Sequence, residues 1–247
     1  MSRKNHTAVF LLIGAAVVAL VFFSFKLSLW SGPEAFIEDR LVSPKGVRSD
    51  IVIVTIDSDS INKIGQWPWP RKVFADFVSR VKPANPKAVA FDVVFSEKSR
   101  FGEADDFALL SAIETLHIPV IMPVEGNALE IGDEISAPKI LAPLKIFTEI
   151  KNVHLGHVNL ILDRDNVVRS FPPEIKSGAD IYESFAVLSA EKAGYKIPEL
   201  KRNASERIVY SGPSGAVRRI PFYQALSGNP EVFSGKLIFI GATSPDL

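Results

Sequence analysis

The sequence contains no cysteine among its 247 residues, which excludes disulfide frameworks and zinc sites built on thiolates. It also has no excess of charge of either sign, because 28 Lys and Arg residues balance 28 Asp and Glu residues. A chain without a basic surplus lacks the electrostatic footprint of nucleic-acid-binding proteins, so we expect no nucleic-acid partner. The four histidines show no HExxH-type spacing, and we predict no metal site and no cofactor.

The chain does contain one long hydrophobic run, AVFLLIGAAVVALVFFSF, at positions 8–25. A helix of this length spans about 27 Å at ~1.5 Å per residue, close to the ~30 Å hydrocarbon core of a bilayer. The run exceeds the ~7–15 apolar residues of a signal peptide, and Lys26 to Trp30 offer no A-x-A cleavage site. We therefore expect a retained transmembrane helix rather than a cleaved signal peptide or a buried core helix.

This run divides the chain into four parts. The predicted parts are a short cytoplasmic tail (1–7), a transmembrane helix (8–25), a juxtamembrane segment (26–50) and an extracytoplasmic domain (51–247). Arg3 and Lys4 favour a cytoplasmic N-terminus, but three cations between 26 and 45 weaken that charge signal. In the juxtamembrane segment Trp30 suits the membrane interface, and a short helix is expected at 34–41.

Strand and helix patterns alternate after position 50. Buried strands are expected at 51–56, 88–95, 118–124 and 236–242, and helices at 71–82, 104–116 and 181–193. The helix at 71–82 has one apolar stripe, and that at 104–116 is predicted to bury Phe107, Leu110 and Ile113. Alternation with short connections favours parallel pairing. The predicted fold class is α/β, a mixed, largely parallel sheet with flanking helices, preceded by one N-terminal transmembrane helix.

Weaker patterns lie between these elements. A short helix is expected within 141–147, two short strands within 157–175 joined by a turn at Asp163 to Asn166, and a hairpin formed by 207–212 and 216–222. The Asp163 turn resembles a fragment of a calcium loop but lacks the glycine and the distal glutamate, so a turn is favoured. Arg169 is expected to pair with one of its aspartates.

Polar side chains follow the predicted parallel strands. Asp57 and Asp59 come after the first strand, Asp92 lies near the end of the second, and Thr243 follows the last. Ligands collect at the carboxyl edge of parallel sheets, so these residues are candidate ligand-binding groups. The alternative is turn and cap chemistry, in which an aspartate accepts local backbone N–H bonds.

The stretch Trp67-Pro68-Trp69-Pro70-Arg71 is the least random in the chain. Pro70 suits the first position of the helix that follows, which places Arg71 in the first turn, where the helix dipole disfavours a cation. We expect Arg71 to have a carboxylate partner, Asp57 or Asp92. Trp67, Trp69 and Arg71 are candidate ligand-binding residues, with a rigid structural corner as the alternative.

Four blocks of the sequence resemble the second type of the CHASE family, bacterial sensory domains associated with cyclases and histidine kinases. The blocks are IVIVTIDSDSINKIGQWPWPR, AVAFDVVFSE with the downstream DDFALLSAI, GHVNLILDRDNVVRSFP and GKLIFIGATSPDL. They cover almost everything from Ile51 onward, in the order found in the family.

The resemblance implies a sensory input domain on the extracytoplasmic side of the inner membrane, without catalytic activity of its own. Its implied partners are the membrane and an unknown extracytoplasmic ligand, and a homodimer is compatible with it. Relatives continue into further spans and a nucleotide cyclase or kinase, so we expect any output domain to lie outside residues 1–247.

An enzymatic alternative comes from IVIVTIDSDSI, which approximates the first motif of haloacid-dehalogenase-like phosphohydrolases. Asp57 would be the nucleophile, Asp59 the acid/base, and magnesium would neutralise charge. Ser60 and Ile61 depart from the usual ending of that motif, and no lysine block is evident. A periplasmic domain that binds a protein partner and no small ligand is the third alternative.

Overall fold

The computed structural model describes residues 3–26, 46–132, 134–163 and 165–244, which belong to two units, Met1–Lys45 and Gly46–Leu247. In the first unit, helix α1 (Arg3–Lys26) contains the whole predicted run 8–25. Large apolar side chains of α1 are exposed, for example Phe10 (73%) and Leu20 (71%). Judged by length and hydropathy together, no helix among the described residues meets the requirements for crossing a membrane. Trp30 and the helix expected at 34–41 lie outside the described residues.

The second unit is built on a seven-stranded sheet in the order β13-β1-β14-β2-β3-β6, in which β7 also pairs with β3. The strands are β1 (Ile51–Ile56), β2 (Ala88–Asp92), β3 (Val120–Asn127), β6 (Lys139–Leu141), β7 (Val153–His157), β13 (Arg218–Pro221) and β14 (Leu237–Ala242). The pairing of β3 with β6 is antiparallel and the others are parallel. The predicted α/β class with a largely parallel sheet is confirmed, and the last strand lies between the first two.

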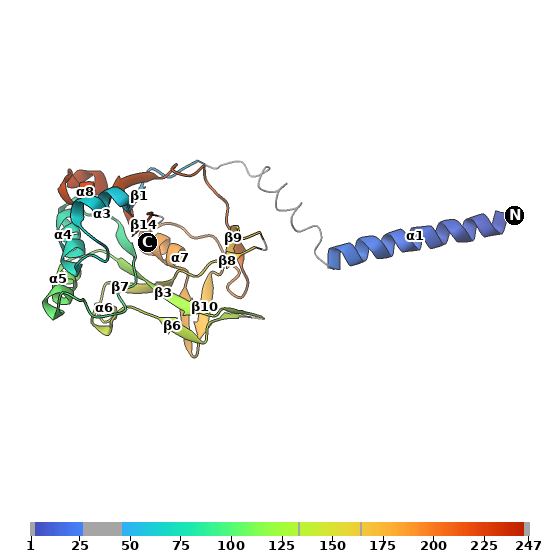
Figure 1. The fold of residues 1–247 in the computed structure, drawn as a ribbon, viewed down its shortest axis with the longest axis horizontal. Helices are drawn as coiled ribbons and strands as arrows, with labels where there is room; N and C mark the ends of the chain where they lie inside the picture. The colour runs from blue at the N-terminus through green and yellow to red at the C-terminus, as the bar shows by residue number, and fades with distance from the viewer. Residues whose placement is uncertain (1–2, 27–45, 133, 164, 245–247) are drawn as a thin grey trace. The chain divides into compact units, whose positions relative to one another are not determined.

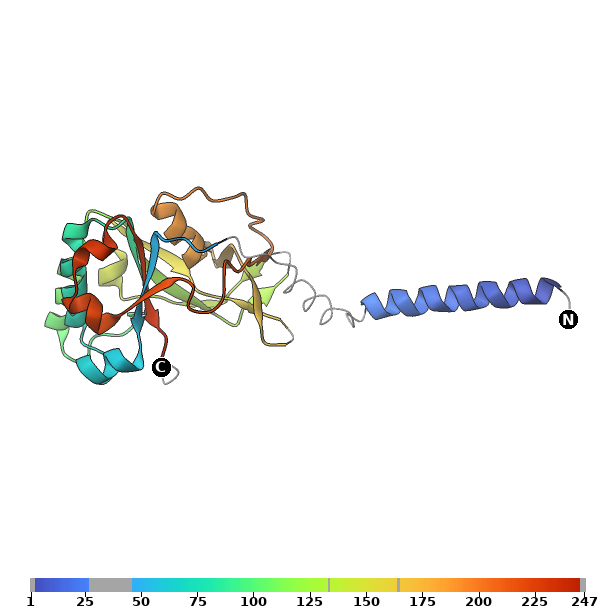
Figure 2. The ribbon, with the colours of Figure 1, turned by 90° about the horizontal axis from the view of Figure 1, so that it is seen from above.

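Helices pack on both faces of this sheet. They are α3 (Ser58–Ile64), α4 (Arg71–Val81), α5 (Glu103–Glu114), α6 (Lys145–Thr148), α7 (Phe185–Lys192) and α8 (Phe222–Ser227), with short 3-10 turns η1 (Lys82–Ala84) and η2 (Pro230–Phe233). Figures 1 and 2 show α3, α4, α5 and α8 together on one side of the strands. Because successive strand residues face opposite ways, Val89 contributes to the core beneath α4 while Ala88 and Ala90 pack with the α7 residues Phe185 and Leu188.

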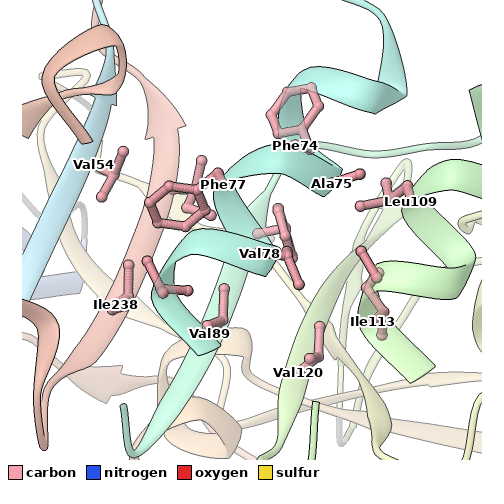
Figure 3. Close-up of a cluster of buried hydrophobic side chains, with 14 of the residues drawn as sticks. Val54, Phe74, Ala75, Phe77, Val78, Val89, Leu109, Ile113, Val120 and Ile238 are labelled. Atoms are coloured by element: carbon pink, nitrogen blue, oxygen red, sulfur yellow. The ribbon is translucent and has the colours of Figure 1, made fainter. Parts of the chain in front are cut away.

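The larger core lies between the sheet and the pair α4 and α5. Figure 3 shows Val54, Val89, Val120 and Ile238 of the strands grouped with apolar side chains of the two helices. The predicted stripe of α4 is confirmed, because Phe74, Phe77, Val78 and Val81 are buried.

The predicted stripe of α5 is partly wrong. Phe107 is 53% exposed, and the buried apolar residues are Leu109, Ala112 and Ile113. Apolar residues occur on several sides of this helix, so periodicity does not select a face, and packing against α4 does.

Two small sheets complete the unit, with orders β11-β10-β5-β4 and β12-β9-β8. Their strands are β4 (Glu130–Ile131), β5 (Ile135–Ser136), β8 (Ile161–Leu162), β9 (Val168–Phe171), β10 (Glu174–Ser177), β11 (Asp180–Glu183) and β12 (Glu206–Arg207). The predicted turn between β8 and β9 is confirmed, with the Asn166 amide donating to the Asp163 carbonyl at 2.9 Å and Asn166 at φ 60°. Arg169 pairs with Asp163 and Asp165, each at 2.9 Å.

Three predicted elements need correction. The expected hairpin of 207–212 with 216–222 does not form, because β12 pairs with β9 and β13 pairs with β1. Alternating apolar residues identify a strand but not its partner. The helix expected at 181–193 begins at Phe185, because β11 ends just before it. The short helix expected within 141–147 is α6, which begins at Lys145, four residues after the start of the predicted range.

Candidate functional site

The predicted site residues fall into two groups, and the structure does not bring the groups together. Asp57, Asp59, Asp92 and Thr243 lie at the carboxyl ends of β1, β2 and β14, as expected for parallel strands. The tryptophans and Arg71 lie around the start of α4, in contact with the larger core. Asp92 and the tryptophan block lie on opposite faces of the sheet, because strand alternation places Asp92 with Ala88 and Ala90 beneath α7. Asp57 and Asp59 lie at the start of α3, on the same side of the sheet as α4.

Asp57 caps helix α3. One carboxylate oxygen accepts the Ser60 backbone N–H at 2.8 Å, and the other accepts the Thr55 hydroxyl at 3.0 Å. Partial burial acts to raise the pKa of Asp57, but the hydrogen bonds from Ser60 and Thr55 outweigh it and lower this pKa. Both oxygens therefore have structural partners, which matches the cap alternative for this residue.

The residues that follow β14 are hydrogen-bonded to the chain beside this cap. The Thr243 and Ser244 amides both donate to the Ile56 carbonyl, at 3.0 and 3.3 Å, and the Ser244 hydroxyl lies 3.0 Å from that of Ser58. Thr243 and Asp59 themselves are exposed, and Asp59 occupies the first turn of α3. The carboxyl edge thus presents hydroxyl and carboxylate groups from three segments of the chain.

Asp92 differs from Asp57 because nothing in the described part of the chain bonds to its carboxyl group. It is accessible to solvent at the end of β2, yet the surrounding protein atoms exclude part of the water around its carboxyl group, and this partial desolvation raises the pKa of Asp92. Gly241 is its register partner on β14, and a side chain there would come within 3.2 Å of Asp92 Cβ. Glycine at this position lets the carboxyl lie against the backbone of the neighbouring strand.

The tryptophan block forms a packed corner. Trp69 is 2% exposed, its indole N–H donates to the Gly65 carbonyl at 2.7 Å, and its ring lies 5.1 Å from that of Phe222. Trp67 is half-buried and meets Trp69 edge to face at 5.4 Å. These contacts favour the structural-corner alternative.

The expected pairing of Arg71 with Asp57 or Asp92 is wrong. The Arg71 Nε lies 3.5 Å from the Asp106 carboxylate, and the guanidinium stacks 4.6 Å from the centre of the Phe95 ring. Asp105, the neighbouring residue on α5, accepts the backbone N–H groups of Arg71 and Lys72 at 2.7 and 2.8 Å. Burial lowers the pKa of Arg71, and Asp106 and Asp105 oppose that shift. The general expectation, a carboxylate partner for a cation in the first helical turn, is confirmed.

Asp105 and Asp106 were not among the predicted site residues. A signal for Asp105 does exist in the sequence, because it precedes the buried Leu109 by four residues and Ile113 by eight, on the same stripe of α5. A carboxylate on a buried stripe requires a partner.

A family model described as the CHASE2 domain matches residues 12–247, which is nearly the whole chain. The chain belongs to the CHASE2 domain family. The resemblance inferred from the four sequence blocks is therefore confirmed, and a CHASE2 domain is a sensory domain of signal-transduction proteins. Neither the curated proteins nor the solved structures contain a match.

Within this CHASE2 domain the family blocks carry the features described above, the Asp57 cap, the tryptophan corner, the Asp92 strand and the β14 exit. No group of three or more histidine, aspartate or glutamate side chains suited to a metal occurs in the described residues. His157 is 1% exposed at the end of β7, and burial lowers its pKa to about 4.

Replacing Asp92 with asparagine is expected to raise the melting temperature of the CHASE2 domain at pH 7. The raised pKa of Asp92 means that its ionised form opposes folding, so the parent loses stability as the pH rises through that folded-state pKa. Below the unfolded-state value of 3.8, both chains carry a neutral side chain, and the difference should disappear. Thermal melts of the parent and of Asp92→Asn between pH 3 and pH 7 measure the difference in melting temperature. The contribution of His157 is the same in both proteins and cancels in this difference. An asparagine variant that is less stable than the parent at pH 7 would contradict the prediction.

Proposed function

We propose that this CHASE2 domain is an extracytoplasmic input domain that binds a small polar ligand at the carboxyl edge of its sheet. The observation that supports this most is Asp92, a solvent-accessible carboxylate that is partly desolvated by its surroundings and has no bonding partner in the described residues. A carboxylate left in that state lowers stability, and such groups concentrate at functional sites. An amine or a hydroxyl-rich molecule would supply the missing donors.

Two other residues complete the proposed site. Thr243 offers an exposed hydroxyl on the same sheet edge, and Asp57 holds the first turn of α3 in place beside it. Because Gly241 separates Thr55 from Asp92 in the register of the sheet, a ligand that bridges β1 and β2 would span about two strand spacings, on the order of 10 Å. Sensing requires that the ligand bind one conformation of the domain better than another.

The site can be tested by thermal shift on the full chain, with putrescine, glycine and glucose as probes for amine, zwitterion and polyol chemistry. At least one of the three classes should raise the melting temperature of the parent, and Asp92→Asn should remove most of that rise. Asp76→Asn is the matched control, since Asp76 is an exposed acid on α4. A shift that is equal in the parent and in Asp92→Asn would refute a ligand site at Asp92.

We further propose that α1 tethers the domain to the inner membrane, with residues 1–7 in the cytoplasm and residues 51–247 in the periplasm. The uncharged run at 8–25 and the exposed apolar side chains of α1 support this, because such a surface is unfavourable in water. A cyclase or kinase that lies outside residues 1–247 would receive the signal. Alkaline extraction of membranes from cells producing the full chain should leave it in the membrane pellet, and complete release would refute the tether.

The phosphohydrolase alternative rests on the spacing of Asp57 and Asp59 alone. Asp57 uses both carboxylate oxygens as hydrogen-bond acceptors within the chain, and Asp59 is a separate, exposed group on α3. This arrangement favours the sensor. Magnesium-dependent hydrolysis of p-nitrophenyl phosphate that disappears in Asp57→Asn would favour the phosphohydrolase over the sensor.

A further inference from the structure

A cavity lies beside edge strand β13, and its charged lining residues are basic, unlike the acids of the sheet edge. Its volume is ≈ 260 Å³, and it is bounded by edge strand β13, helix α8 and the segment 228–233. The residues used below are Arg218, Arg219, Ile220, Gln224, Asn229 and Val232.

Two adjacent arginines border the cavity. Arg218 and Arg219 are both exposed, and within the described residues neither side chain makes a hydrogen bond or an ion pair. Because successive strand residues face opposite ways, Arg218 shares a face of β13 with Ile220, and Arg219 lies on the other face. A third cation lies next to them, because the Arg80 guanidinium donates to the Gly228 carbonyl on the cavity wall. Glu231 is the nearby exposed acid on η2. Positive charge is therefore in excess around the opening.

The rest of the lining is apolar or neutral. Ile220 and Val232 are partly buried and pack against the larger core, with Phe233, 1% exposed, behind them. Gln224 and Asn229 add amide groups at the rim, and the Asn229 side-chain oxygen is already used in accepting the Glu231 N–H at 3.0 Å. Its amide N–H groups remain as donors.

This combination suits a small organic acid. A guanidinium binds a carboxylate through two parallel N–H bonds, and a short hydrocarbon chain gains from contact with an apolar floor. Cavities for drug-sized ligands measure about 300–1,000 Å³, so a space of this size suits a molecule of a few carbon atoms. We propose that this cavity binds a short-chain carboxylate, with its head group at Arg218 and its hydrocarbon part on Ile220 and Val232.

The cavity is separate from the site proposed at the sheet edge. Arg218 pairs in register with Val52 near the start of β1, whereas Asp57 follows the other end of that strand, about 16 Å away at ~3.3 Å per residue. The inference therefore does not depend on the ligand of Asp92, and each can fail without the other.

The test measures binding of butyrate to the full chain by calorimetry at constant ionic strength, with inorganic phosphate as a second probe. The parent should bind butyrate more tightly than phosphate, because phosphate gains nothing from the apolar floor. Arg218→Gln should weaken butyrate binding on the order of tenfold or more. Lys151→Gln is the matched control, since it removes one exposed cation elsewhere and should leave the affinity unchanged.

Val232→Glu provides a second, independent variant, because it places a negative charge on the apolar floor and should abolish butyrate binding. Circular dichroism checks that each variant is folded. Loss of binding in the folded variants, together with its retention in the lysine control, supports the proposal. Unchanged butyrate affinity in any folded cavity variant overturns it, as does equal affinity for phosphate and butyrate, which would indicate a non-selective surface for anions.

Discussion

Replacing Trp69 with alanine is expected to lower the free energy of unfolding by about 3–5 kcal/mol, the range for removing a large aromatic side chain from a core. The Trp69 ring lies 5.4 Å from Trp67, 6.2 Å from Phe74 and 5.1 Å from Phe222, so its removal opens a cavity among three rings. It also leaves the Gly65 carbonyl without the indole N–H. Urea denaturation of the full chain, followed by far-ultraviolet circular dichroism, measures the change.

Two further variants make that measurement specific. Phe101→Ala removes an aromatic ring that is 51% exposed, and its effect should stay within about 0.5 kcal/mol. Trp69→Phe keeps a ring but loses the indole N–H, so its effect should lie between the two. If Trp69→Ala cost no more than Phe101→Ala, the tryptophan corner would not be a structural element, and the aromatic ligand wall would become the better interpretation of WPWPR.

Replacing Asp106 with alanine is expected to destabilise the domain by about 3–5 kcal/mol, because it leaves a buried charge without its partner. The Arg71 side chain is 13% exposed and that of Asp106 is 4% exposed, and the Arg71 Nε lies 3.5 Å from the Asp106 carboxylate. Asp106 also accepts the Ser99 backbone N–H at 2.9 Å. The same urea titration measures the loss.

The neighbouring ion pair of Lys72 and Asp76 serves as the control, since it lies on the same helix with side chains that are 66% and 55% exposed. Asp76→Ala should change the stability by less than about 0.5 kcal/mol. A double variant, Arg71→Met with Asp106→Leu, should recover most of the loss, because buried ion pairs can be replaced by apolar residues of similar volume. Equal effects of Asp106→Ala and Asp76→Ala would show that burial of the Arg71 pair contributes little.

Several parts of the fold could be predicted because local pattern and final environment agree. The run IVIVTI is apolar on both faces, as a strand requires when helices cover both sides of a parallel sheet, and β1 lies between β13 and β14. The stripe of α4 has one orientation that buries its phenylalanines and valines. The position of Asp57 and Asp92 at one edge follows from parallel pairing alone.

The errors concern partners distant in sequence. Arg71 meets Asp106, 35 positions along the chain, and the choice among Asp57, Asp92 and Asp106 depends on which helix packs beside α4. The segment before Pro221 contains a strand, but its partner is β1, more than 160 residues earlier, and not the adjacent segment. Neither the partner of Arg71 nor the partner strand of β13 can be predicted from the local spacing of apolar residues.

The sequence by itself determined the α/β class, the apolar helix at the N-terminus, the family and the set of polar residues at the strand ends, because each depends on residue types over short windows. Only the tertiary structure decided that Asp57 is a cap with both oxygens engaged while Asp92 has no partner in the described residues, and that Arg218 lies beside a cavity with an apolar floor. The physical reason is that hydrogen bonding, desolvation and cavity shape depend on which atoms packing brings within a few ångströms, and these atoms come from segments far apart in the chain.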